Sequence, residues 1–298
     1  MTKSMRIGIL STVQNLDPIK AQDFVSALVL KQVFDSPFAG RQVSEKPRPV
    51  LFAGPLEKEP GGGEEGIYSA LVRPDLTFSD GTPVKGEHIV TSLNRAAPFR
   101  EKATAEAVGD RVVFRLLQPN ARFDLFLSQL FCAVTLPKGD TFLGTGPFTV
   151  APDATPQVMR LVKNPNYRSP VEIDELLFTY YEPGKDGSGD KLVEAFSRGE
   201  VEFCSVLHRE AVSSLKEVRK HFEPGISTAF LYFNTEHEGL QDRRLRQAMA
   251  MSINRLDLTQ ICYTNALAFS AKGLLPPFMS KRRDGLSQNL GRAKELIA

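Results

Sequence analysis

Short apolar runs alternate with amphipathic stretches along most of the chain. The first run, residues 5–10, is too short for a helix and leads through a polar bend to Pro18, so we expect a strand there. From Asp23 onward, apolar residues fall on one helical face until Pro37 and Gly40 close the segment. The pattern predicts that the chain opens with a strand, a turn and a helix.

The part of the chain that follows predicts a compact unit of strands and helices. Residues 41–66 are rich in proline, glycine and charge, which suits a crossing into a new lobe. A helix is expected to begin near Lys85, and a strand over residues 112–116 lies between turn-forming pairs. A helix over residues 123–130 completes this predicted α+β unit.

Behind residues 144–147 the pattern returns to short strands and helices. Residues 230–233 are an apolar run too short for a helix, so we expect a buried strand. Asp242 is expected to cap an amphipathic helix that reaches Leu256. This alternation favours a mixed sheet covered by helices. The other expected elements are strands over residues 148–150, 159–162, 176–180 and 201–206, and helices over 192–198 and 292–298.

Composition and charge exclude several classes of protein. A chain of 298 residues is long enough for about two domains. Because 37 Lys and Arg balance 35 Asp and Glu, the net charge of +2 gives no field that would favour nucleic acid or an anionic membrane. No run approaches the roughly 20 apolar residues of a membrane span, so we expect no membrane insertion. The first ten residues lack the apolar core of a signal peptide, so no export signal is expected.

The residues that usually carry catalysis or metal binding are scattered. Three cysteines are an odd number at wide spacing, which argues against a disulfide framework and a zinc site. Ser213 and Lys216 have the Ser-x-x-Lys spacing of acyl-transfer enzymes, but the accompanying motifs are missing, so we interpret them as part of a solvated helix face. We expect no catalytic residue, no metal site and no cofactor. The histidines without paired spacing are His88, His208, His221 and His237.

Five separated segments carry a resemblance to a known family. Turn chemistry alone selects some of these residues, so the order of the segments matters more than any one of them. In this order the chain resembles the bacterial extracellular solute-binding proteins of the peptide/nickel family (family 5), which serve ABC importers. The segments are Leu16-Asp17-Pro18; residues 77–83 with 92–95; 144–148 with 163–167; 233–235 with 242 and 245–255; and 274–277.

The resemblance implies a fold and a division of the chain. The implied fold class is α/β (mixed α+β), a periplasmic-binding-protein-like (type II) multi-lobe fold with the last lobe incomplete. Residues 1–41 and 144–225 would form a discontinuous first lobe, 42–143 a small inserted α+β lobe, and 226–298 the start of a second large lobe. Members of the family normally carry a leader and continue further, so the chain looks truncated at its carboxyl end and lacks a signal peptide.

The resemblance also implies a function, which is to bind an oligopeptide or similar small polar solute between lobes, without being an enzyme. Thr145 and Gly146 at the lobe junction, and Phe233 and Asn234 at the opening of the last lobe, are the expected ligand-binding residues. Structural roles are the alternative for each, and Gly146 also allows a positive φ before Pro147.

An alternative function is a cytoplasmic sensory or protein-interaction module that no longer serves transport. The partner would be an ABC permease in the first case and a cytoplasmic protein in the second. The location is periplasmic by resemblance and cytoplasmic by the absent signal peptide. No helix-turn-helix segment precedes Met5, so DNA binding is not implied.

Overall fold

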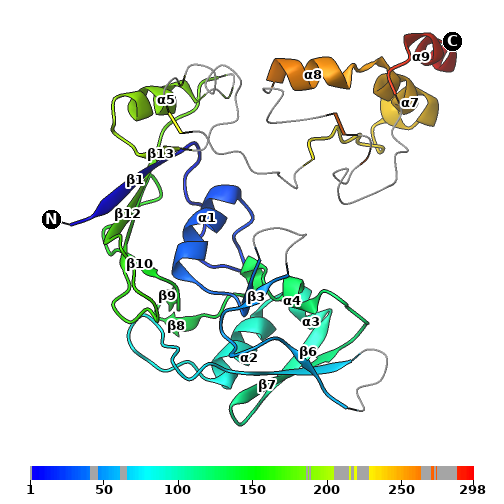
Figure 1. The fold of residues 1–298 in the computed structure, drawn as a ribbon. Helices are drawn as coiled ribbons and strands as arrows, with labels where there is room; N and C mark the ends of the chain where they lie inside the picture. The colour runs from blue at the N-terminus through cyan, green and yellow to red at the C-terminus, as the bar shows by residue number, and fades with distance from the viewer. Residues whose placement is uncertain are drawn as a thin grey trace. The chain divides into compact units, whose positions relative to one another are not determined.

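The computed structural model describes residues 2–40, 46–60, 66–185, 187, 189–204, 215, 218–219, 228–262, 270–271, 273 and 287–298. Contacts divide the chain into two compact units. Unit 1 comprises Met1–Glu182 and Glu194–Cys204, and unit 2 comprises Pro183–Val193 and Ser205–Ala298. Figure 1 shows the alternation of strands and helices that the sequence predicts.

A five-stranded mixed sheet gathers strands from both ends of unit 1. Its order is β10-β11-β12-β1-β13. The amino-terminal strand β1 lies parallel to β12, from Ser4 opposite Glu175 to Ile9 opposite Tyr180, and parallel to β13 on its other side. The other neighbours in the sheet are antiparallel. The strands are β1 (Ser4–Ile9), β10 (Phe148–Val150), β11 (Val158–Lys163), β12 (Glu175–Tyr180) and β13 (Phe203–Cys204).

Helix α1 (Phe24–Val33) covers part of this sheet (Figure 1). It begins where expected, because the side chain of Asp23 accepts a hydrogen bond of 2.7 Å from the backbone amide of Ser26. Val29 and Leu30 are fully buried and join the apolar residues of the sheet in one hydrophobic core. The helix ends at Val33, because the next residue, Phe34, is extended.

A four-stranded antiparallel sheet forms the second hydrophobic core of unit 1. Its order is β4-β5-β7-β6, and α2 (Gly86–Arg95) packs on β6 and β7 (Figure 1). Ile89 and Leu93 are fully buried beside Phe114, as the helical face predicts. The strands are β4 (Glu57–Lys58), β5 (Ile67–Leu71), β6 (Ala103–Val108) and β7 (Arg111–Leu116).

The remaining elements of unit 1 are short, and several of them, including α3 and α4, contribute to the core of the four-stranded sheet. The helix expected over residues 123–130 is only one turn long, because α4 ends at Phe126 and a separate 3₁₀ turn follows. The boundaries of the inserted lobe stay a prediction, because both cores belong to unit 1. These elements are β2 (Phe38–Ala39), β3 (Arg48–Pro49), α3 (Ala97–Arg100), α4 (Phe123–Phe126), η1 (Leu130–Cys132), β8 (Leu136–Lys138) and β9 (Thr141–Leu143).

Helices dominate the described part of unit 2. Asp242 caps α7 as expected, but the predicted single helix ends at Ser252. The helix breaks because Ile253 is extended and the side chain of Asn254 accepts hydrogen bonds from the first amides of the next helix. Helices α7 and α9 pack against each other. The elements are η2 (Glu238–Leu240), α7 (Arg243–Ser252), α8 (Arg255–Cys262) and α9 (Leu290–Ile297); α5 (Asp190–Ser197) is shared between the two units.

The expectation of a buried strand over residues 230–233 is wrong. This segment carries neither strand nor helix. The side chains of Phe230, Leu231 and Tyr232 are 64%, 66% and 87% exposed. A short apolar run predicts burial only when a partner surface covers it, and no described element of unit 2 does so.

None of the described helices is both long and apolar enough to cross a membrane.

Candidate functional site

Three turns that carry the family resemblance meet at one place in unit 1. The hydroxyl of Thr77 donates a hydrogen bond of 2.9 Å to the carbonyl of Asn166, and the side-chain amide of Asn166 donates one of 3.0 Å to the carbonyl of Ser79. The backbone amide of Ser79 in turn donates to the carbonyl of Gly144 over 3.0 Å. The turns at residues 77–83, 144–147 and 163–167 therefore support each other.

The predicted site residue Gly146 lies directly against the end of α1. A Cβ atom on Gly146 would lie 2.6 Å from the carbonyl carbon of Val33, which is closer than real Cβ contacts allow. Its amide donates to the carbonyl of Val33 over 2.9 Å, and its carbonyl accepts a hydrogen bond of 2.8 Å from the buried side chain of Asn164. Gly146 does not have a positive φ, so close backbone approach is the reason for glycine here.

The predicted site residue Thr145 belongs to what we call the junction cluster, made of Asp35, Thr145 and Arg168. The hydroxyl of Thr145, which is 2% exposed, donates a hydrogen bond of 3.2 Å to Oδ2 of Asp35. Arg168 Nη1 lies 2.6 Å from the same oxygen. The side chains of Arg168 and Asp35 are only 10% and 15% exposed, so this ion pair is largely withdrawn from water.

An aromatic ring borders the junction cluster. The guanidinium carbon of Arg168 lies 4.6 Å from the centroid of the Tyr167 ring. Burial raises the pKa of Tyr167, and the negative charge of Asp35 raises it further. The phenol therefore stays neutral and serves as a packing surface and hydrogen-bonding group.

A second ion pair joins two further motif residues. Arg95 Nη2 lies 2.7 Å from Oδ2 of Asp17, and Arg95 Nη1 donates to the hydroxyl of Thr135 over 3.0 Å. The guanidinium carbon lies 4.1 Å from the centroid of the Phe142 ring. Arg95 comes from α2 on the four-stranded sheet, whereas Asp17 precedes α1. This pair is thus a second link between the two cores of unit 1.

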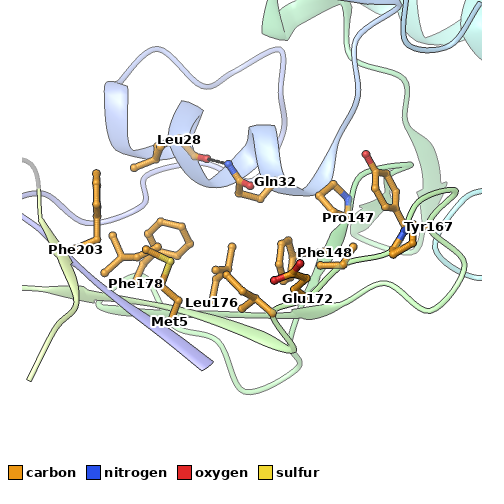
Figure 2. A pocket seen from close by; sticks show the side chains of 14 residues that line it. Met5, Leu28, Gln32, Pro147, Phe148, Tyr167, Glu172, Leu176, Phe178 and Phe203 are labelled. Carbon is orange, nitrogen blue, oxygen red and sulfur yellow. Dashed lines mark hydrogen bonds between the residues drawn. The ribbon is translucent and has the colours of Figure 1, made fainter. Parts of the chain in front are cut away.

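An apolar pocket of about 550 Å³ lies between α1 and the five-stranded sheet (Figure 2). Figure 2 shows Leu28 and Gln32 of α1 across from Met5, Leu176 and Phe178 of the sheet. The side-chain amide of Gln32 is turned to the carbonyl of Leu28. The volume falls in the range of small-molecule pockets, and the lining suits an apolar group. The sequence did not predict this pocket. Two alternate apolar residues of β1, Met5 and Ile7, line its sheet side.

The two predicted site residues of unit 2 lie at the end of the exposed segment 230–232. The side-chain oxygen of Asn234 accepts a hydrogen bond of 3.0 Å from the amide of Glu236, and its carbonyl accepts one of 3.2 Å from His237. Asn234 therefore shapes a turn, and Phe233 beside it is partly buried. Because Thr145 and Gly146 belong to unit 1, a joint ligand site with Phe233 and Asn234 stays a prediction.

The described thiols are poorly suited to nucleophilic chemistry. Cys132 is fully buried, and burial raises the pKa of its thiol far above the usual range. Burial also raises the pKa of the Cys204 thiol. Among the described residues, no group of three or more His, Cys, Asp or Glu side chains gathers as a metal site. Ser213, Lys216, His208 and His221 lie outside the described residues, as does the side chain of Cys262.

The sequence pattern of the bacterial extracellular solute-binding proteins, family 5 (middle), matches residues 67–298. The chain belongs to this family of bacterial extracellular solute-binding proteins, and the resemblance carried by the ordered motifs is confirmed.

Curated relatives of known name agree with the family. The peptide transport periplasmic protein SapA of Haemophilus influenzae is 26% identical over 201 residues, covering 65% of this chain and 34% of that protein. The probable di/tripeptide-binding protein 5 of Pseudomonas aeruginosa is 28% identical over 157 residues, covering 51% of this chain and 29% of that protein. The chain thus spans about a third of the length of these relatives.

Solved structures confirm the predicted fold class. The periplasmic binding protein DppA from Helicobacter pylori, in complex with the peptide STSA, matches with a TM-score of 0.84 and 17% identity, covering 99% of this chain and 65% of that chain. NikA from Staphylococcus aureus, in complex with Ni(L-His)2, matches with a TM-score of 0.82 and 16% identity, covering 99% of this chain and 64% of that chain. The mixed α/β chain therefore has the periplasmic-binding-protein-like fold.

Proposed function

We propose that the chain is part of a receptor that binds a peptide or a similar small polar solute and delivers it to an ABC permease. The family match over residues 67–298 carries this proposal. The names of the curated relatives, which specify peptide transport and di/tripeptide binding, favour peptides as the solute class. The name of the Haemophilus relative, a periplasmic protein, also favours a periplasmic location.

The exposed segment of unit 2 supports a peptide as the ligand. Phe230, Leu231 and Tyr232 offer apolar and aromatic surface to solvent, and such side chains commonly line ligand sites. Among the hydrogen bonds between described residues, none engages the backbone of residues 230–233. These main-chain groups are therefore able to pair with the backbone of an extended peptide.

A role in binding, and not in catalysis, is the simplest account of the chemistry. The names of the relatives specify peptide transport and di/tripeptide binding, and burial raises the pKa of the described thiols. Ligand recognition by backbone pairing and aromatic contact requires no nucleophile and no cofactor.

Calorimetric titration of the intact chain tests the proposal. We expect saturable binding to pools of two- to six-residue peptides, and a rise in melting temperature, because a ligand present at about 100 times its Kd stabilises the folded state by about 2.7 kcal/mol. Free amino acids and sugars of matched concentration serve as controls. Binding to sugars alone, or to no pool, would contradict a peptide receptor.

A pull-down from native lysate tests the partner. Recovery of an ABC permease supports delivery to an importer, whereas recovery of a cytoplasmic complex without the permease favours the sensory alternative. No described contact and no comparison favours that alternative at present.

A further inference from the structure

We propose that Asp35 is a positioning residue that fixes the two cores of unit 1 relative to each other, by holding both chain crossings between them with one carboxylate. This role is independent of which solute the chain binds. It goes beyond ligand binding because it concerns how the two cores of unit 1 are held relative to each other, and not how a ligand is bound.

The chain makes two main passages between the two cores. The core of the five-stranded sheet includes buried residues up to Phe34 and again from Phe148 onward, together with Ala133 at the boundary between the cores. The core of the four-stranded sheet begins at Phe38 and includes Cys132 and Val134 on either side of Ala133. The outgoing crossing is therefore residues 34–38. The return crossing runs through residues 143–148.

Asp35 is the point where the crossings meet. It lies on the outgoing crossing, and its Oδ2 accepts the hydroxyl of Thr145 from the return crossing. The same oxygen pairs with Arg168, which belongs to the turn that follows β11. The backbone carbonyl of Asp35 accepts a hydrogen bond of 2.9 Å from the amide of Val134 at the end of the other core. Asp35 therefore connects its own crossing, through its side chain and its backbone, to the segments of Thr145, Arg168 and Val134.

Burial makes the loss of the Asp35–Arg168 ion pair costly. Removal of one partner from a largely buried ion pair leaves the other charge without compensation, whereas an exposed pair is readily replaced by water. Arg115 and Glu106, which join β7 and β6, are 53% and 52% exposed and form a matched exposed pair. The Asp35 link therefore opposes displacement of the crossings far more than a surface pair does.

A second link joins the two cores at another point. Arg95 of α2 reaches Asp17, which precedes α1, and also contacts Thr135 and Phe142. Each link opposes displacement of the cores at its own position. We infer that the two cores move as one body and that the junction cluster is the part that sets their angle.

Amide hydrogen exchange on the full chain tests this inference. In Asp35→Asn the uncompensated Arg168 charge should loosen the crossings, so exchange of the Val134 and Gly146 amides should rise at least about tenfold. Amides within β7 and β12 should keep their parent rates. The double variant Asp35→Asn/Arg168→Met removes the stranded charge and should recover part of the protection.

Two further variants keep the test decisive. Arg115→Gln breaks the exposed pair and should change none of these rates. Thr145→Val removes only the hydroxyl contact and should speed exchange at Gly146 by a few fold while the ion pair remains. Unchanged exchange at both crossings in Asp35→Asn, or an equal rise at the crossings and in β7 and β12, would overturn the proposal, because Asp35 would then be neutral or merely one contributor to global stability.

Discussion

Asp17 and Arg95, 78 positions apart in the sequence, form an ion pair of 2.7 Å that joins the segment before α1 to α2. Each belongs to a different motif of the family, so the motifs mark contacts inside the lobe. Their side chains are 11% and 27% exposed, which places the pair between surface and core.

Substitution of Arg95 by Met should destabilise unit 1. The change leaves the carboxylate of Asp17 largely buried without its partner, and we expect a loss of about 3 kcal/mol in the free energy of unfolding. Urea denaturation measures it. Arg115→Gln, which breaks an exposed pair, should cost less than about 0.5 kcal/mol; equal losses in both variants would contradict a special role for Arg95.

Gly146→Ala should destabilise the same lobe by a steric effect. The added methyl group would collide with the backbone of Val33, and relief of such a clash costs about 2 kcal/mol. Gly54 is the matched control, because a Cβ there has nothing within 4 Å. Gly54→Ala should be neutral or slightly stabilising, and thermal unfolding of the two variants side by side distinguishes them.

Asp23 should make the stability of α1 depend on pH. Burial alone would raise the pKa of this carboxyl, but hydrogen bonds from Ser26 outweigh burial and lower it below its usual value of 3.8. A lowered folded-state pKa means that the stabilisation is complete above about pH 4 and is lost as the pH falls through the folded pKa.

The matching experiment compares unfolding at pH 7 and pH 3. Asp23→Ala should cost about 1 kcal/mol at pH 7 and less at pH 3. Asp23→Asn retains a capping oxygen, so it should keep most of the stability and lose the pH dependence. A cost that is the same at both pH values would show that the charge of Asp23 does not contribute.

The buried thiol of Cys132 should not react in the native protein. Its raised pKa and full burial both keep the thiolate population and its access low. Maleimide labelling followed by peptide mass mapping should modify Cys132 only on unfolding and Cys204, which is partly exposed, sooner. Labelling of both at one rate under native conditions would be inconsistent with this packing.

Substitution of Tyr232 by Ala distinguishes an effect on ligand affinity from an effect on the stability of the fold. Its side chain is 87% exposed, so Tyr232→Ala should change the free energy of unfolding by less than about 0.5 kcal/mol. If the exposed segment contacts a peptide, affinity in calorimetry should fall about tenfold, since truncating an aromatic residue that anchors an interface costs more than about 1 kcal/mol. Phe24→Ala, which removes another exposed ring at 71%, is the control that should leave affinity unchanged.

Individual strands and helices were predictable because the patterns that indicate them lie within a few neighbouring residues. The apolar run of β1, the helical face that runs from Asp23 onward and the helical face of α2 each depend on neighbouring residues, and the structure confirms all three. Strand β6 escaped prediction because its alternating positions are mostly alanine, which gives little contrast with the polar residues between them.

Long-range relations were not predictable from one sequence. Nothing in the pattern states that β1 pairs with β12, or that Asp17 faces Arg95, because these depend on how distant segments fold together. The apolar run at residues 230–233 shows the same limit, since burial requires a covering surface that periodicity does not specify. The order of the motifs pointed to the fold, but not to the contacts the motifs make.

The central place of β1 has a consequence for synthesis on the ribosome. The strands of the four-stranded sheet come from one contiguous stretch, so that sheet is complete once residue 116 has emerged. Strand β1 precedes both of its neighbours in the chain and must wait for residues 175–180 and 203–204 before either neighbour exists. The nascent chain therefore carries Ile7 and Ile9 unpaired while those residues are synthesised, a period in which a chaperone would protect it from aggregation.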